Sequence, residues 1–415
     1  MIHEFGFGKE KQYVEIPDDL YCRELTANDD IEFKPLDADV KYALENPIGS
    51  PRLKDIVKPG EKIAIITSDV TRPMPTYKVM PALLDELSEA GVNFDDVTLV
   101  FALGSHRKQT EEEKKRLAGE YAYERINVVD SDPDDCINMG VTKSGTPVDI
   151  TRVVAEADRR IALGNIEFHY FAGYSGGAKA IMPGVSTPAA IQSNHKMMIR
   201  DEACAGRLEG NPVREDIEEA GRICGIDFIL NVVLDEHKNI VKVVAGDSVK
   251  AHRVGAEYLD KLYTKRIDSK ADIVIVSQGG APKDLNLYQT QKALDNSKHA
   301  VKDGGVIILI GSCAEGYGEH TFEDWMLNSE SPDDLVNKIR QKFVLGGHKA
   351  AAIGMVLQKA DIYLVSDMKP ELVEKSFMKP YTSAQKAFED ALSKFGGKAD
   401  VITMPYGGSV LPKLK

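Results

Sequence analysis

The chain has 415 residues, of which 43% are hydrophobic and 28% charged, and its formal net charge is −13. This length exceeds the usual size of one hydrophobic core, so we expect an ordinary globular protein with two domains. The acidic balance argues against a general nucleic-acid binder, because binding to phosphate backbones requires clustered Lys and Arg.

The sequence contains no apolar run of about 18 residues, and its first residues lack the pattern of a signal peptide. We therefore expect no membrane span and a cytoplasmic protein that acts on small molecules. The five cysteines are scattered, without CxxC spacing. Such usage is typical of free thiols in a reducing compartment and disfavours a cysteine-based zinc site.

Short apolar runs alternate with amphipathic segments, a pattern typical of parallel strands connected by helices. Strands are predicted at residues 62–68, 97–103, 125–129, 161–166, 228–234, 273–277, 305–310 and 361–365. Helices are predicted at residues 79–90, 109–117, 212–224, 247–263, 285–300, 333–342, 349–358 and 383–393. The Val, Ile and Leu content of the strands indicates sheets covered on both faces. We expect an α/β fold with two domains of mainly parallel sheets flanked by helices, and an active site in the interdomain cleft.

A polar stretch at residues 264–270 lies between a long predicted helix and a new strand, which indicates a domain boundary. We expect an N-terminal α/β domain over residues 1–268, which carries the candidate lysine and histidines, and a C-terminal α/β domain over residues 269–398. The tail, residues 399–415, begins with a strand-like run. It is expected to return to the N-terminal domain or to pair with the C-terminal one.

Polar residues follow three predicted strands, where ligands bind in open α/β sheets. Asp69, Thr71 and Arg72 follow the first strand, His106 the second and His169 the fourth. A carboxylate, a guanidinium and two imidazoles would then line one rim of a sheet. Each residue also has a purely structural explanation, as a turn or helix cap, a surface ion pair or a buried core histidine.

A glycine-rich segment at residues 167–195 also contains Lys179 and His195. It does not match the phosphate-binding Walker signature, because alanines flank the lysine, and this disfavours a P-loop enzyme. A helix is predicted to begin near Pro188, which puts His195 about two turns along it as a partly exposed side chain.

A second cluster follows the strand at residues 273–277. Tyr288, Gln289 and Lys292 are spaced so that they can face one direction on a helix. Two interpretations are open: a solvated helix face, or the second wall of an interdomain pocket for an anionic substrate.

The motifs DVTRPMP, GSHR, EFHYFAGYSGGAK, QSNH and YQTQK, in this order, resemble those of the nickel-dependent lactate racemase family. The resemblance spans most of the chain. It implies an isomerase, a racemase or epimerase that interconverts D- and L-2-hydroxy acids, most directly lactate, with a nickel-pincer nucleotide as cofactor. Other proteins make this cofactor, so cofactor-biosynthesis proteins are implied partners besides the small-molecule substrate.

The resemblance also implies roles for individual residues. Lys179 would be attached covalently to the cofactor, and His195 would be the protein ligand to nickel. His106 and His169 would be the catalytic acid/base pair, one for each face of the substrate. One would take the hydroxyl proton while the substrate hydride passes to the cofactor ring, and the ketoacid would receive both back on its opposite face.

Further residues would bind the cofactor or the substrate. The resemblance implies that Asp69, Thr71 and Arg72 orient the cofactor. It implies substrate binding by Arg72, Tyr288, Gln289, Lys292 and His348.

His348 marks a departure, because some family members have a tryptophan at this place, whereas Trp325, the single tryptophan of this chain, lies elsewhere in the sequence. A more polar wall would admit malate, 2-hydroxyglutarate or a sugar acid.

Two other classes of protein remain as alternatives. His106, His169 and His195 could hold zinc with an open position, as in a hydrolase. The glycine-rich loops alone could instead serve a noncatalytic nucleotide-binding protein.

Overall fold

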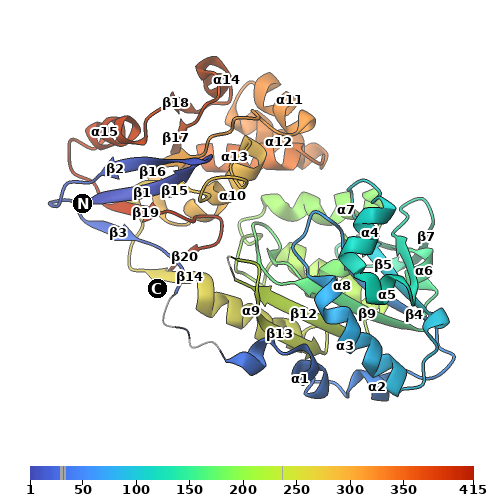
Figure 1. Ribbon diagram of the computed structural model, residues 1–415. Helices are drawn as coiled ribbons and strands as arrows, with labels where there is room; N and C mark the ends of the chain where they lie inside the picture. The colour runs from blue at the N-terminus through green and yellow to red at the C-terminus, as the bar shows by residue number, and fades with distance from the viewer. Residues whose placement is uncertain (29–30, 32–33, 236) are drawn as a thin grey trace. The chain divides into compact units, whose positions relative to one another are not determined.

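The structure is a computed structural model that describes residues 1–28, 31, 34–235 and 237–415. The chain forms two compact units (Figure 1). Unit 1 consists of residues 1–30 and 262–415, and unit 2 of residues 31–261. Each unit has a six-stranded, mainly parallel sheet flanked by helices. The predicted α/β class is therefore confirmed.

The sheet of unit 2 has the strand order β13-β12-β9-β4-β5-β6, and its neighbours run parallel except for β12 and β13. Its strands are β4 (Ile63–Ser68), β5 (Val97–Ala102), β6 (Asn127–Asp130), β9 (Arg159–Asn165), β12 (Phe228–Leu234) and β13 (Ile240–Gly246). Two short antiparallel pairs accompany it: β7 (Cys136–Val141) with β8 (Pro147–Thr151), and β10 (Phe168–His169) with β11 (Gly173–Tyr174).

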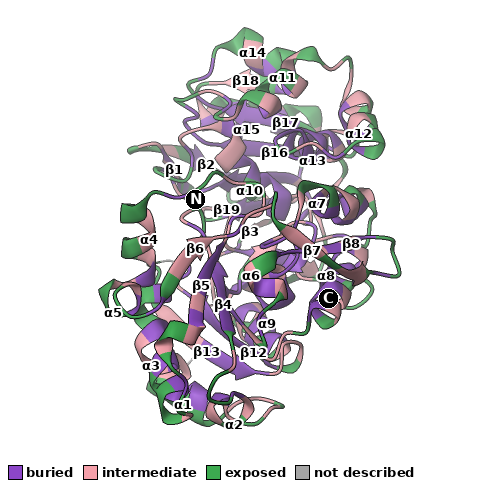
Figure 2. Ribbon diagram, turned by 90° about the vertical axis from the view of Figure 1, so that its right-hand side faces the viewer, coloured by how far each residue is buried: buried purple, intermediate pink, exposed green. Residues whose placement is uncertain are grey.

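The helices of unit 2 bury one face each against this sheet or against one another (Figure 2). In α3 the apolar side chains repeat at helical spacing, and Val79, Leu83 and Leu87 pack in one core with Ile65 of the sheet. These helices are α1 (Val40–Glu45), α2 (Leu53–Ile56), α3 (Thr76–Glu89), α4 (Glu111–Ala118), α5 (Glu120–Tyr123), α6 (Arg152–Ala155), α7 (Pro188–His195), α8 (Pro212–Cys224) and α9 (Lys250–Tyr263).

The sheet of unit 1 has the order β18-β17-β16-β15-β19-β3 and is parallel throughout. Its strands are β3 (Cys22–Glu24), β15 (Ala271–Ser277), β16 (Val301–Ile310), β17 (Asp361–Val365), β18 (Lys379–Tyr381) and β19 (Val401–Met404). Unit 1 also contains the pair β1 (Ile2–Phe7) and β2 (Glu10–Glu15), and the pair β14 (Thr264–Ile267) and β20 (Leu411–Leu414).

Successive side chains of β15 enter two different cores, because they alternate between the faces of the sheet. Val274 and Val276 pack on one face, and Ile273 and Ile275 on the other. Both faces are therefore covered, as the continuous apolar runs predicted. The helices of unit 1 are α10 (Leu287–Ser297), α11 (His320–Asn328), α12 (Pro332–Gln341), α13 (Gly347–Leu357), α14 (Pro370–Lys375) and α15 (Ala384–Lys394).

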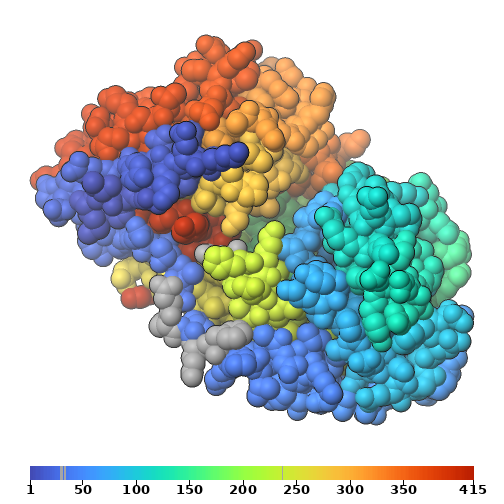
Figure 3. All heavy atoms as spheres, viewed as in Figure 1, coloured from blue at the N-terminus to red at the C-terminus, as the bar shows by residue number. Residues whose placement is uncertain are grey.

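The division into units differs from the expected one at both ends of the chain. Residues 1–30 belong with the C-terminal segment, because Phe5 and Val14 of the first two strands pack in the same core as Ile273 of β15. Figure 3 shows this N-terminal segment, in dark blue, against the orange and red C-terminal residues. The tail also stays in unit 1, where β19 pairs with β15 and β3.

All five cysteines are free, as expected. In the described part of the chain, no helix combines the length and apolar character needed to span a membrane.

Candidate active site

Three neighbouring strands of unit 2 carry candidate residues at their carboxyl ends. Strands β9, β4 and β5 are adjacent and parallel, so the segments that follow them leave at the same edge of the sheet. Asp69, Thr71 and Arg72 follow β4, His106 follows β5, and His169 lies in β10, just beyond β9. The topology thus brings together side chains that are far apart in the sequence.

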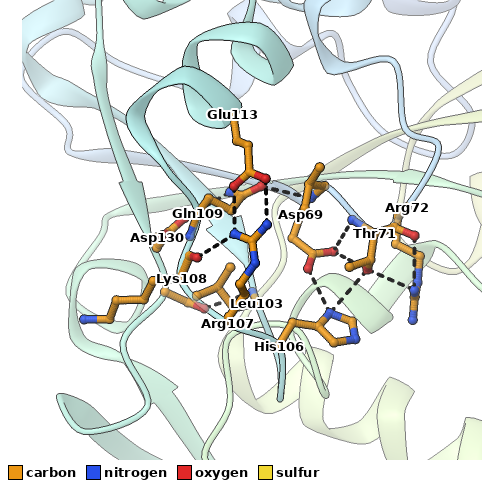
Figure 4. A network of polar contacts seen from close by, with 12 residues as sticks. Asp69, Thr71, Arg72, Leu103, His106, Arg107, Lys108, Gln109, Glu113 and Asp130 are labelled. Carbon is orange, nitrogen blue, oxygen red and sulfur yellow. Dashed lines mark hydrogen bonds and ion pairs between the residues drawn. The ribbon is translucent and has the colours of Figure 1, made fainter. Parts of the chain in front are cut away.

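Asp69 and His106 form a hydrogen-bonded carboxylate–imidazole pair (Figure 4). Nδ1 of His106 lies 2.8 Å from Oδ2 of Asp69, and the Thr71 hydroxyl donates to Oδ1 of Asp69 over 2.7 Å. Because a carboxylate only accepts, Nδ1 of His106 carries the proton and Nε2 carries the lone pair. The pair can therefore accept a proton at Nε2 of His106, whose side chain is 32% exposed.

The Asp69 carboxyl is ionised at neutral pH. Its burial opposes ionisation, but the hydrogen bonds from His106 and Thr71 and the charge of Arg72 outweigh this effect, so the pKa of Asp69 lies below its ordinary value. Arg72 itself donates to the Thr71 hydroxyl over 3.0 Å. Asp69 therefore does more than cap a turn.

Two side chains that the sequence analysis did not single out join the loops after β4 and β5. The side-chain oxygen of Gln109 accepts from the N–H of Val70 over 2.9 Å, and Asp130 accepts from the backbone and side-chain amides of Gln109 at 2.8 and 3.0 Å. Arg107 binds Glu113 through two nitrogens at 2.8 and 2.7 Å, as Figure 4 shows. The Gln109 contact links the loop after β4 to the loop after β5, whereas the Arg107–Glu113 pair lies within the segment after β5.

His169 takes the opposite hydrogen-bonding state. Its Nδ1 accepts from the backbone N–H of Ala172 over 3.2 Å, so the neutral ring carries its proton on Nε2. Removal from water, followed by the charge of Arg72, holds the pKa of His169 well below its ordinary value, so the ring is neutral.

Lys179 lies in a 3-10 turn, Gly177–Ala180, that follows a glycine with positive φ. Gly176 has a φ of 74°, and a Cβ there would lie 2.8 Å from the side-chain oxygen of Asn231. That same oxygen accepts from the N–H of Gly177 over 2.8 Å. The glycines thus allow the backbone before Lys179 to pack closely against β12.

The surroundings of Lys179 favour its neutral form. Burial, and then the charges of Arg214 and Arg72, lower the pKa of Lys179 well below its ordinary value. Arg72 acts on Lys179 and on His169 alike, so these three residues lie in one electrostatic neighbourhood. A neutral amine is a nucleophile, and this state suits Lys179 to covalent attachment of a ligand.

His195 is the last residue of α7, and the structure corrects its expected partial exposure. It is only 8% exposed, because this end of the helix packs against the start of α8. The ring of Phe171 lies between two of the predicted histidines, with ring centroids 4.9 Å from His195 and 4.5 Å from His169. His195 therefore belongs to the same cluster as His169.

The start of α8 holds the loop that follows β10. The amide of Asn211 donates to the Phe171 carbonyl over 2.9 Å, Nε of Arg214 donates to the Ala172 carbonyl over 3.1 Å, and Nη2 of Arg214 bonds to the Tyr174 carbonyl. Both side chains are completely buried. The Asn-Pro sequence predicts a helix start at this point, but no local pattern predicts these contacts.

The three predicted histidines do not form a shared metal site. Within the described residues, no group of three or more His, Cys, Asp or Glu side chains is arranged to hold a metal ion. This arrangement does not supply the ligand set that the zinc hydrolase alternative requires.

The second predicted cluster lies in unit 1, on the first turns of α10. Lys292 is exposed, and Tyr288 and Gln289 are half-buried. Lys349 of α13 donates to the Tyr288 carbonyl over 2.6 Å, and its ammonium lies 4.1 Å from the centroid of the Tyr288 ring. Lys349 is thus a cation next to the predicted trio that the sequence analysis missed.

At the start of α13, the surroundings of His348 differ from the polar wall expected there. His348 is buried against Phe343, and burial together with the charge of Lys349 lowers its pKa to about 3, so the ring is neutral. Trp325 of α11 lies against Gly347, where a Cβ would be 2.6 Å from an indole carbon. The single tryptophan is therefore close to His348 in space, although it is distant in the sequence.

Two family models match the chain. One is described as the lactate racemase N-terminal domain and matches residues 7–206, and the other as the lactate racemase C-terminal domain and matches residues 267–411. With the α/β fold, these matches define the protein as an enzyme of the isomerase class. The chain belongs to the lactate racemase family, as the resemblance predicted.

Two characterised relatives agree with this assignment. The chain is 36% identical over 426 residues to a lactate racemase from Thermoanaerobacterium thermosaccharolyticum, with 99% of each chain covered. It is 33% identical over 385 residues to a lactate racemase from Lactiplantibacillus plantarum, with 90% of each covered.

Solved structures show the same fold. The lactate racemase apoprotein from Thermoanaerobacterium thermosaccharolyticum matches all of both chains with a TM-score of 0.88 at 35% identity. A protein from Thermotoga maritima matches with a TM-score of 0.64 at 19% identity, covering 94% of this chain and all of the other, which is a likeness of fold.

Proposed function

We propose that this protein is a racemase of 2-hydroxy acids, with lactate as the first candidate substrate, and that it works with a nickel-pincer nucleotide attached to Lys179. Family membership supports the reaction type. The observation that carries the proposal is a pair of histidines at one sheet rim whose Nε2 atoms are in opposite states, a lone pair in His106 and an N–H in His169.

The residues present fit this cofactor. The pKa of Lys179 is lowered, which favours the neutral amine that a covalent link requires, and His195 offers an imidazole from the end of a rigid helix. When bound, the nickel-pincer nucleotide would supply a hydride acceptor and donor for the substrate Cα. Proteins that make the cofactor are proposed partners.

His106 is proposed to take the hydroxyl proton of the substrate at Nε2. Its Nδ1–H remains on Asp69, whose negative charge stabilises the imidazolium that forms. The Thr71 hydroxyl donates to the Asp69 carboxylate, and Arg72 donates to that hydroxyl. These two contacts hold the carboxylate, and with it the His106 ring, in place.

His169 is proposed to act on the other face of the substrate through its Nε2–H. Removal from water, and then nearby positive charges, lower the pKa of this ring in the free protein. A bound 2-hydroxy acid carries a carboxylate, which offsets those charges and so raises the pKa of His169. Before it returns its Nε2 proton to the ketoacid, His169 would have to take up a proton at Nδ1, which accepts from the Ala172 N–H in the free protein.

Arg72 is proposed to bind the substrate carboxylate, and Tyr288, Gln289, Lys292 and His348 are proposed as further substrate-binding residues. Lactate is the first candidate because both characterised relatives are named lactate racemases. Malate, 2-hydroxyglutarate and sugar acids are the alternative substrates, and a panel of enantiopure acids separates these cases.

The test is a chiral assay after co-expression with the cofactor-making proteins. Chromatography on a chiral column should show D- and L-lactate converting to a racemic mixture, and intact-mass analysis should show added mass on Lys179 together with bound nickel. His106→Ala and His169→Ala should each lower kcat by about 10²–10⁴-fold, the usual contribution of general acid–base catalysis.

His237→Ala is the matched control, because this histidine of unit 2 is exposed. It should keep the activity of the unaltered protein. Normal turnover in His106→Ala or His169→Ala would remove the acid/base assignment, and full activity with an unmodified Lys179 would remove the proposed attachment.

A further inference from the structure

A buried chain of hydrogen bonds runs from Asp216 of α8 to the ring of His195. Asn194 lies between them: its amide nitrogen donates to Oδ2 of Asp216 over 2.7 Å and to the Val213 carbonyl over 3.2 Å. Its amide oxygen lies 2.8 Å from Nδ1 of His195. Asn194 is 0% exposed and Asp216 is 2% exposed, so water does not compete for these contacts.

The orientation of the Asn194 amide follows from its neighbours. A carboxylate and a backbone carbonyl can only accept, so the side of the amide that faces Asp216 and Val213 must be the NH₂ group. The opposite side is then the oxygen, which needs a donor. Nδ1 of His195 must therefore carry a proton, and the lone pair of the neutral ring lies on Nε2.

Asp216 is itself fixed from the opposite side. The Thr142 hydroxyl donates to Oδ1, and the Thr146 hydroxyl donates to Oδ2 over 2.8 Å. Both threonines are buried in the turn between β7 and β8. The carboxylate thus has hydrogen bonds to both oxygens and cannot rotate away from Asn194 without losing buried contacts.

A purely structural role would account for part of this network. The bonds from Thr142, Thr146 and Asn194 to Asp216 join the hairpin and α7 to α8, and they would do so whatever occupied position 195. They do not require the last bond, from His195 to the Asn194 oxygen. The bond between His195 and the Asn194 oxygen has one chemical effect: it decides which ring nitrogen of His195 carries the proton.

We infer that Asp216 and Asn194 are positioning residues that fix the tautomer of His195 with its lone pair on Nε2. Metal-binding histidines commonly have their other ring nitrogen bonded to a polar group, which sets tautomer and ring orientation. The functional meaning of this inference rests on the proposed role of His195 as the nickel ligand. The tautomer itself can be measured without any cofactor.

The experiment uses the full-length apoprotein with isotope-labelled histidine. Long-range proton–nitrogen correlation spectra distinguish the two tautomers, and His195→Gln identifies the signals of His195. The unaltered protein should show the Nδ1–H form. Asn194→Ala removes the acceptor of Nδ1–H, so it should shift His195 toward the Nε2–H form. Asp216→Asn removes one of the two acceptors that orient the Asn194 amide and leaves the Val213 carbonyl, so its shift should be smaller.

Thr146→Val is the matched control, because it removes one hydrogen bond to Asp216 and leaves Asn194 in place. It should lower the free energy of unfolding without changing the tautomer. An Nε2–H form in the unaltered protein would overturn the inference. A pure Nδ1–H form that persists in Asn194→Ala, with folding checked by circular dichroism, would overturn it as well.

A second measurement separates this inference from the proposed function. After co-expression with the cofactor-making proteins, nickel retention is compared among variants with equal mass added at Lys179. Asn194→Ala should weaken nickel retention by about 10–100-fold, the usual effect of removing such a partner. Full retention in Asn194→Ala overturns the positioning role, whereas full retention in His195→Gln overturns the nickel-ligand assignment and leaves the tautomer result standing.

Discussion

At Asp69, the local environment decides the charge of a single group. The carboxyl is almost completely buried, yet its pKa is lowered because hydrogen bonds and a nearby guanidinium favour the ionised form. Hydrogen bonding and charge thus outweigh desolvation at this position. Because the same contacts fix the proton on Nδ1 of His106, the protonation of the site depends on Asp69 remaining ionised.

This lowered pKa gives a prediction for stability against pH. An unfolded aspartate has a pKa of about 3.9. The stabilising contribution of Asp69 should therefore be fully present above about pH 4 and should be lost as the pH falls through the lower pKa of the folded protein. In denaturant unfolding, the unaltered protein should be more stable than Asp69→Asn at neutral pH, and the difference should shrink toward about pH 3. A difference that stays constant over this range would contradict the lowered pKa.

At the scale of elements, the hairpin of β10 and β11 owes its path to glycine. Gly173 has a φ of +77°, and a Cβ there would lie 2.0 Å from the Arg207 carbonyl oxygen. Gly145, in the turn between β7 and β8, has a φ of +83° with nothing within 4 Å of a Cβ. At both positions the left-handed backbone would strain any other residue. Only at Gly173 would a Cβ also collide with neighbouring backbone.

Alanine at these two positions should therefore have unequal effects. Gly145→Ala should cost about 1–2 kcal/mol through its backbone conformation alone. Gly173→Ala should lower the free energy of unfolding by roughly 2 kcal/mol more, because backbone has to move to admit the methyl group. Denaturant titration of both variants measures the difference. Equal losses in the free energy of unfolding would show that the backbone near Gly173 moves aside at no cost.

The start of α8 contacts two segments that carry predicted histidines. Asn211 and Arg214 hold the carbonyls of the loop after His169, while Asp216 reaches His195 through Asn194. One helix start therefore orients two of the predicted histidines. A helix is suited to this task because its rigid backbone fixes the spacing of the side chains on one turn.

At the scale of the whole molecule, unit 2 is continuous in sequence and unit 1 is not. Phe5, Phe7, Val14 and Ile16 contribute buried side chains to a core of unit 1. Burial of each such side chain stabilises by about 1.5–3 kcal/mol. Together they amount to a large part of the stability of a typical domain, about 5–15 kcal/mol.

A fragment experiment tests this division. Residues 31–261 should fold alone, with a cooperative thermal transition followed by circular dichroism. Residues 262–415 should not fold, because one face of their sheet lacks the part of its cover that Phe5, Phe7, Val14 and Ile16 supply. Joining residues 1–30 after position 415 through a flexible linker should restore a cooperative transition. A folded 262–415 fragment would show that the N-terminal strands are dispensable.

Much of the fold could be predicted from the sequence. The strand at 228–234 and the helix at 212–224 have the predicted bounds, since a continuous apolar run and an Asn-Pro helix start are local signals. The antiparallel pairs β1–β2 and β7–β8 were missed, because short strands with mixed side chains lack such a pattern.

The sequence by itself determined the α/β class and the polar residues at the ends of the strands, because both depend on neighbouring residues. Only the tertiary structure decided which unit holds the first thirty residues, that Trp325 lies against Gly347, and that Asn194 links Asp216 to His195. Those relations join segments far apart in the chain. They depend on how the packed sheets and helices meet, and local spacing carries no information about that.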